Sequence, residues 1–91
     1  MIIRSQNKKG IVNLNMIDTI EAYDGQVRYF SGGGIETAGT LGTYSTEEKA
    51  IKVLDMIQNK YFEHMTVEKN SAIVGILERP KVFQMPQDSE V

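Results

Sequence analysis

Short runs with aliphatic β-branched residues, separated by polar or glycine-containing segments, fill the first half of the chain, and this pattern is typical of short β-strands. Residues 2–5 and 11–14 are the first two such runs, and Val12 and Leu14 fall on one face of the second. The polar segment between them, residues 7–10, ends in glycine and favours a turn. The sequence therefore predicts two short strands joined by a tight turn.

A β-hairpin is predicted around Asp24 and Gly25, which separate the strand-like runs 19–23 and 26–30. A two-residue Asp-Gly loop favours a type I′ turn, because both residues tolerate a positive φ. That turn fixes the cross-strand pairs: Tyr23 opposite Gln26, Ala22 opposite Val27, Glu21 opposite Arg28 and Ile20 opposite Tyr29. One face then carries the side chains Ile20, Ala22, Val27 and Tyr29. On the other face, the oppositely charged pair is worth about 0.2–1 kcal/mol.

The glycine-rich segment 31–34 is expected to be a flexible break after the hairpin. Residues 35–44 are then expected to form a further strand with four side-chain positions on one face: Ile35, Thr37, Gly39 and Leu41. Gly39 and Gly42 weaken this strand, and they predict a bulge or a close backbone approach.

A single strong helix is predicted to begin at Ser45, because Ser45 and Glu48 have the spacing of a capping box. Apolar residues then recur at helical spacing and form a stripe: Ala50, Val53, Leu54, Ile57 and Tyr61, widened by Ile51 and Phe62. Leu54 and Ile57 are expected in the core. A helix of about 17 residues would be about 25 Å long, which is enough to cross a small sheet.

The last third of the chain gives weaker patterns. Residues 63–71 are polar and are expected to form a loop or a frayed helix end, and residues 72–77 fit either a strand or a short helix. Residues 81–85 predict a short strand that stops at a proline, and residues 87–91 a polar, disordered tail. Residues 1–86 are therefore expected to form a single domain.

The composition is that of an ordinary globular domain, with 41% hydrophobic and 24% charged residues in 91. The absence of cysteine excludes disulfides, a thiol nucleophile and cysteine-based metal sites. Ten basic against twelve acidic residues give a net charge of −2, which argues against wrapping nucleic acid. The small basic pairs Lys8-Lys9 and Arg79/Lys81 are interpreted as solubilising residues at turns and strand edges.

No motif in the sequence supports catalysis or cofactor binding. Gly34 and Gly39 have the glycine spacing of a phosphate loop, but the Lys and Ser/Thr that must follow are missing. His64 stands alone, and neither Glu63 nor Glu68 has the spacing of a metal motif, so it is interpreted as a histidine of a surface loop. No serine lies in a nucleophile elbow. We therefore expect a non-enzymatic protein without metal or cofactor.

Three further groups of residues were weighed as sites. The carboxylates Glu47, Glu48 and Asp55 are expected on the solvent side of the helix, where acid–base catalysis is disfavoured. The aromatic group Tyr23, Tyr29 and Phe30 could stack nucleobases, but the apolar neighbours of Tyr29 favour core packing. The last residues, Ser89-Glu90-Val91, match a short pattern captured by PDZ domains, a match that often arises by chance.

Three stretches of the sequence resemble a small uncharacterised protein family of Gram-positive bacteria and their prophages. These are residues 1–8, residues 41–50 with the helical positions that follow, and residues 82–86. The resemblance implies a bacterial or phage cytoplasmic setting. It assigns no catalytic or binding residue.

These observations predict an α+β fold: an antiparallel β-meander packed on one long amphipathic helix, with a short C-terminal strand. The sheet could curl toward a small barrel, as in pleckstrin-homology-like folds. No apolar run approaches the roughly 20 residues of a membrane span, and no secretory signal is seen, so a cytoplasmic protein is expected.

The expected function is a non-enzymatic protein-interaction module, such as an accessory protein of a phage or mobile element. The alternative is a nucleic-acid-associated regulator. A homodimer or a protein partner is expected to bind through a terminal strand, Ile2-Ile3 or Val82-Phe83, or through a face that the helix leaves uncovered.

Overall fold

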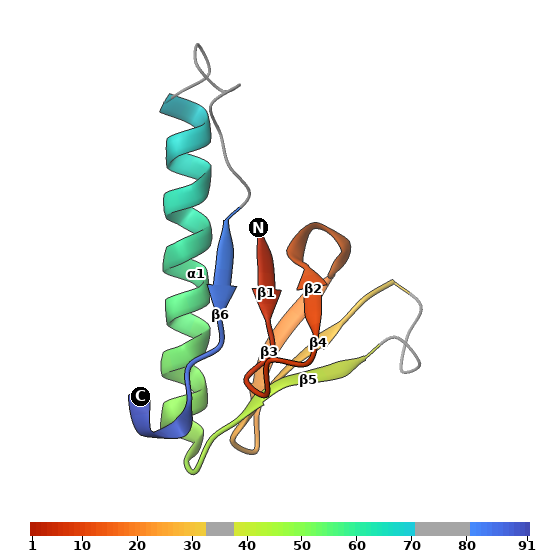
Figure 1. Ribbon diagram of the computed structural model, residues 1–91, viewed down its shortest axis with the longest axis vertical. Coiled ribbons are helices and arrows are strands. Elements are labelled where there is room, and N and C mark those ends of the chain that lie inside the picture. The colour runs from red at the N-terminus through yellow and green to blue at the C-terminus, as the bar shows by residue number, and fades with distance from the viewer. Residues whose placement is uncertain (33–37, 71–80) are drawn as a thin grey trace.

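The computed structural model describes residues 1–32, 38–70 and 81–91, with the side chains of 63–70 excepted. These residues form two three-stranded sheets and one long helix (Figure 1). In chain order the elements are β1 (Ile2–Arg4), β2 (Ile11–Asn13), β3 (Thr19–Tyr23), β4 (Gln26–Phe30), β5 (Gly39–Thr43), α1 (Glu47–Asn70) and β6 (Val82–Gln84). Short 3₁₀ helices lie at Leu14–Met16 and Asp88–Glu90.

The predicted α+β class, the long helix and the short C-terminal strand are confirmed. The single meander is not, because the strands divide into the sheets β2-β1-β6 and β3-β4-β5, which do not close into a barrel. In the first sheet β1 is central, pairing antiparallel with β2 and parallel with β6. The expectation that Ile2-Ile3 forms a sheet edge is therefore wrong, whereas Val82-Phe83 does lie in an edge strand.

The β3–β4 hairpin has the predicted turn and register. Asp24 and Gly25 have φ angles of 52° and 76°, as a type I′ turn requires. The cross-strand partners are those predicted, from Tyr23 with Gln26 through to the pair of Ile20 and Tyr29. The ion pair of Glu21 and Arg28 is also present, at 2.5 Å between carboxylate and guanidinium.

The bulge predicted for β5 is present, whereas the close contact at Gly39 comes from a side chain and not from another backbone. Two steps along β5, from Gly42 to Thr40, pair with one step along β4, so Leu41 is the extra residue. A Cβ at Gly39 would lie 2.6 Å from the Tyr29 ring, so only glycine leaves room for that ring.

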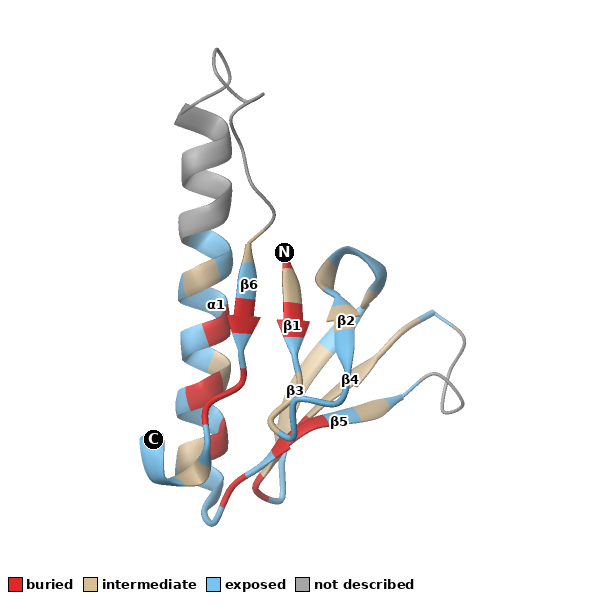
Figure 2. Cartoon of the chain, viewed as in Figure 1, coloured by how far each residue is buried: buried red, intermediate tan, exposed pale blue. Residues whose placement is uncertain are grey.

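The core draws buried side chains from both sheets and from the N-terminal half of α1, as the red positions in Figure 2 show. Its apolar members are Met1, Ile3, Val27, Leu41, Tyr44, Ala50, Val53, Ile57, Phe83 and Met85. Ile57 is buried as predicted, but Leu54 is only half-buried. Ile51 and Phe62 do not widen the buried stripe, because they are 47% and 70% exposed.

The helix begins one residue later than predicted. The Thr46 hydroxyl, not that of Ser45, accepts the backbone N–H of Lys49, at 3.1 Å, so the predicted capping box of Ser45 is wrong. Residues 63–71 are expected from the sequence to form a loop or a frayed helix end. The helix continues through Asn70, so the loop, with His64 in it, is wrong.

The expectation of a disordered tail at residues 87–91 is wrong. Asp88–Glu90 form a 3₁₀ helix, and Val91 packs against the core. The Asp88 carboxylate accepts the backbone N–H of Ser45 at 2.7 Å and lies 3.5 Å from the Lys49 ammonium. The expectations for residues 33–34, residues 35–37 and residues 71–77 lie outside the described residues.

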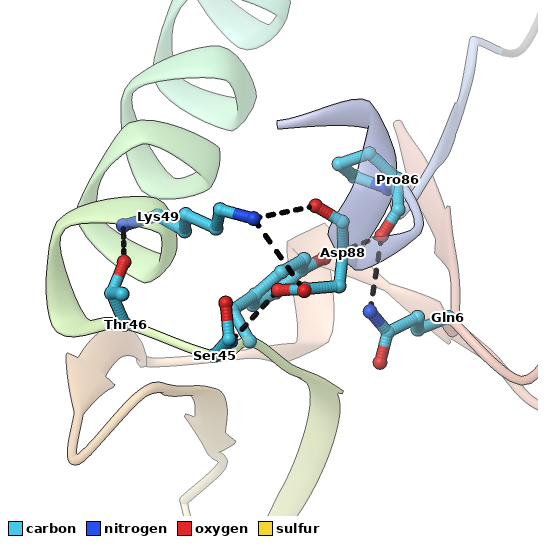
Figure 3. A network of polar contacts seen from close by, with 7 residues as sticks. Gln6, Ser45, Thr46, Lys49, Pro86 and Asp88 are labelled. Atoms are coloured by element: carbon cyan, nitrogen blue, oxygen red, sulfur yellow. Dashed lines mark hydrogen bonds and ion pairs between the residues drawn. The ribbon is translucent and has the colours of Figure 1, made fainter.

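A polar junction joins the two sheets beside these contacts (Figure 3). The Pro86 carbonyl accepts hydrogen bonds from the buried Tyr44 hydroxyl, at 2.8 Å, and from the Gln6 amide, at 3.2 Å. Gln6 also donates its backbone N–H to Leu41 and accepts that of Thr43, both in β5. Residues that follow β1, β5 and β6 therefore meet at one place.

The helix cap gives the first prediction. We expect Thr46→Ala to lower the free energy of unfolding by about 1 kcal/mol, because it removes the hydroxyl that caps α1. Ser45→Ala should have little effect, because Ser45 contributes a backbone N–H to Asp88 that alanine keeps. Urea unfolding of the two variants measures the difference, and a larger loss for Ser45→Ala would contradict the assignment of the cap.

Tyr44 gives the second prediction. Burial, together with the nearby negative charges of Asp88 and Glu90, raises its pKa from 10.0 to about 12. The unfolded chain therefore loses the phenol proton before the folded protein does, and stability should fall as the pH rises from 10 to 12. The full effect is of the order of 2 kcal/mol.

Urea unfolding at about pH 8 and about pH 11 measures roughly half of that loss, because pH 11 lies midway between the two pKa values. In Tyr44→Phe the part of the pH dependence due to this hydroxyl should disappear. Tyr23→Phe is the matched control, because it removes the hydroxyl of a tyrosine that is 59% exposed. An equally steep loss of stability in Tyr44→Phe would show that another group causes it.

Candidate interaction site

An open apolar groove of about 450 Å³ runs between α1 and the segment that leads from β2 into β3. Its lining consists of Leu14, Ile17, Ile20, Leu54, Ile57, Gln58 and Tyr61. All but one of these side chains are aliphatic or aromatic. Such a concave apolar surface is typical of a binding site for another molecule.

The groove results from the way in which one helix packs against two sheets (Figure 1). Ile20 comes from the inner face of the hairpin, and Leu54 and Tyr61 come from the predicted stripe of α1. The most buried part of the stripe contacts the strands, and the edge of the stripe is left partly open to solvent. Met16 and Phe62, which are close in sequence to lining residues, are 72% and 70% exposed.

The sequence identified most of these helical residues but assigned them to the core. The residues on the other side of the groove, Leu14 and Ile17, lie in and beside a 3₁₀ helix at positions expected to form a strand end and a bend. No local pattern marks a groove, because it depends on how far the helix lies from this segment. The sequence gives one hint, namely the expectation that a single helix leaves a face of the sheet uncovered.

The outer face of the β3–β4–β5 sheet carries a second cluster. The Arg28 guanidinium carbon lies 4.5 Å from the centre of the Tyr23 ring and 5.6 Å from that of Phe30, while Glu21 pairs with the guanidinium. Tyr29 is on the opposite face, so the three aromatic residues weighed as a stacking platform do not form one. The charge of Arg28 is balanced by its own neighbour, which leaves little attraction for a phosphate.

The carboxylates weighed as sites are exposed, as expected. The Glu47 carboxylate accepts the backbone N–H groups of Asp24 and Gly25, at 2.8 and 3.4 Å, so it supports the hairpin turn. The carboxylates of Glu48 and Asp55 take part in no side-chain hydrogen bond or ion pair within the described residues. The side chains of Glu63, His64 and Glu68 lie outside the described residues.

In the part of the chain that the structure describes, no three His, Cys, Asp or Glu side chains gather as ligands for a metal ion. Nor is any described helix both long and apolar enough to cross a membrane. Ser89-Glu90-Val91 is not extended, because the Glu90 carboxylate accepts the backbone N–H of Gln87 and Val91 packs against the core. Comparison of the chain with family models, curated proteins and solved structures finds no match.

Proposed function

We propose that this chain is a non-enzymatic protein-interaction module and that the apolar groove beside α1 is its binding surface. The observation that carries the proposal is the uncovered apolar lining of that groove, with Leu54 half-buried and Tyr61 36% exposed. Burying one large apolar side chain contributes about 1.5–3 kcal/mol. A partner that covers several of them therefore gains enough free energy for a specific complex.

The occupant we propose is a second copy of the chain. The helical lining residues Leu54, Ile57, Gln58 and Tyr61 follow the i, i+3, i+4, i+7 spacing of one helix face, which suits another helix laid along the groove. The protein's own α1 offers such a helix, since Phe62 is 70% exposed outside the groove. A twofold arrangement would let each copy fill the groove of the other.

The cellular setting is part of the same proposal. A cytoplasmic accessory protein of a phage or mobile element is supported by the family resemblance of the sequence alone. The alternative function, a nucleic-acid-associated regulator, is less well supported, because the stacked Arg28 is paired with Glu21 and the chain carries a net charge of −2.

Light scattering over a hundredfold range of concentration tests the proposal. We expect the mass to rise from 10.2 kDa toward twice that value. Tyr61→Glu should hold the protein as a monomer, because it places a charge in the groove. Ile11→Glu is the matched control and should dimerise like the wild type, since Ile11 is 60% exposed and does not line the groove.

The helical circular dichroism of each variant shows whether it remains folded. A wild-type mass that stays at 10.2 kDa at every concentration would contradict the second copy as occupant. Equal association of Tyr61→Glu and wild type would show that the interface lies elsewhere.

A further inference from the structure

The two sheets face one another across an open seam, away from the apolar groove. β2 is the outer strand of one sheet and β5 is the outer strand of the other. Between them lies a cavity of about 320 Å³, which is lined by Gly10, Ile11 and Val12 on one side and by Tyr29, Thr40 and Leu41 on the other. Its remaining lining comes from the β1–β2 turn: Ser5, Asn7 and Lys9.

Contacts of Gln6 close one end of the seam. There, the Gln6 backbone N–H donates to the Leu41 carbonyl at 2.8 Å, and the Thr43 N–H donates to the Gln6 side chain at 2.9 Å. Among the described residues, no strand pairing joins β2 to β5 beyond this point.

The main chain of β2 presents unpaired groups at its outer edge. The bonds from Ser5 N–H to the Gly10 carbonyl and from Leu14 N–H to the Met1 carbonyl set the phase of the β1–β2 ladder. With that register, Ile11 and Asn13 direct their N–H and C=O groups away from β1. The Asn13 carbonyl caps the 3₁₀ helix Leu14–Met16. No hydrogen bond within the described residues reaches the outward N–H groups of Ile11 and Asn13 or the Ile11 carbonyl, and the Ile11 side chain is 60% exposed.

The turn beside this edge is basic. Arg4, Lys8 and Lys9 are all exposed, and Lys9 lines the cavity itself. The ion pairs within the described residues are those of Arg28 with Glu21 and of Lys49 with Asp88, so none of these three has an acidic partner there. The cluster stands out on a chain whose net charge is −2.

From these observations we propose that the β2 edge binds an extended, acidic segment of another protein by strand addition. The segment would pair its main chain with Ile11 and Asn13 and place acidic side chains beside Lys8 and Lys9. Every second side chain would face the cavity, where Val12, Tyr29 and Leu41 favour an apolar residue.

The charge of the segment follows from the same lysines. Lysine beside an edge strand discourages pairing with a neutral or basic strand. The acidic side chains of an added strand would instead be attracted by the positive charges of Lys8 and Lys9. This surface is distinct from the apolar groove, so it accommodates a foreign partner whether or not the protein dimerises.

The test uses the full chain and a short capped peptide in which valine and aspartate alternate. On titration we expect saturable shifts of the β2 amide signals in nuclear magnetic resonance spectra. Hydrogen exchange at Ile11 and Asn13 should slow, whereas exchange at Val12, whose amide faces β1, should not change. The same peptide with lysine in place of aspartate should not bind, nor should one whose backbone nitrogens are methylated.

Protein variants separate charge from main-chain pairing. Lys8→Glu with Lys9→Glu should weaken binding roughly fivefold, as expected for two exposed charge pairs. Lys52→Glu with Lys60→Glu makes the same change in net charge on α1 and should have no such effect. Ile11→Pro removes the outward N–H and should abolish binding, while Ile11→Ala keeps that N–H and should retain binding.

Protection of the Met85 amide, which donates to Arg4, shows whether Ile11→Pro keeps its β1–β6 pairing. If that variant unfolds, the methylated peptide gives the same information on the wild-type protein. The proposal is overturned if the aspartate peptide shows no saturable binding, if the lysine peptide binds equally well, or if methylation of the peptide backbone makes no difference.

Discussion

The hydrogen bonds that meet at the Pro86 carbonyl tie the two sheets to one another. Tyr44, directly after β5, and Gln6, just after β1, both donate to this oxygen. Two residues later, the Asp88 carboxylate accepts the backbone N–H of Ser45, where the chain turns into α1. The strand ends and the start of the helix are therefore fixed relative to one another within a few residues.

This junction accounts for both surfaces to which we assign binding. It fixes β6 beside β1 and brings one helix over strands from two sheets, so Ala50, Val53 and Ile57 are buried. On one side of α1, the space toward the β2–β3 segment is left as the apolar groove. At the sheets' other boundary, the contacts of Gln6 close one end of the seam between β2 and β5.

The features that the sequence predicted well are those decided within a few residues. The type I′ turn sets the whole hairpin register, because a two-residue loop determines which residues of the two strands lie opposite one another. The features that it missed depend on distant residues. Ser45 and Thr46 are adjacent hydroxyl residues, and either is suited to cap the helix. Thr46 is the cap, while the backbone N–H of Ser45 bonds to Asp88, which is distant in the sequence. The ordering of the tail depends on the same contact.

The position of β1 and the groove were unpredictable for the same reason. The parallel partner of β1 is β6, at the other end of the chain, and a strand of three residues carries no pattern that reveals it. Leu54 is half-buried because of the distance between α1 and the segment that leads from β2 into β3. Helical spacing showed which residues share a face of α1, but it could not show how much of that face the strands cover.

The central claim is that the junction at Pro86 makes both sheets and the helix one cooperative unit. Native-state hydrogen exchange in increasing urea tests it directly. The informative amides are those of Met85, bonded to Arg4 in one sheet, and Tyr44, bonded to Gly25 in the other. Our account predicts that the two amides reach the same free energy of opening as urea rises. If the Met85 amide opens by a separate transition of lower free energy, the sheets are independent and the account is wrong.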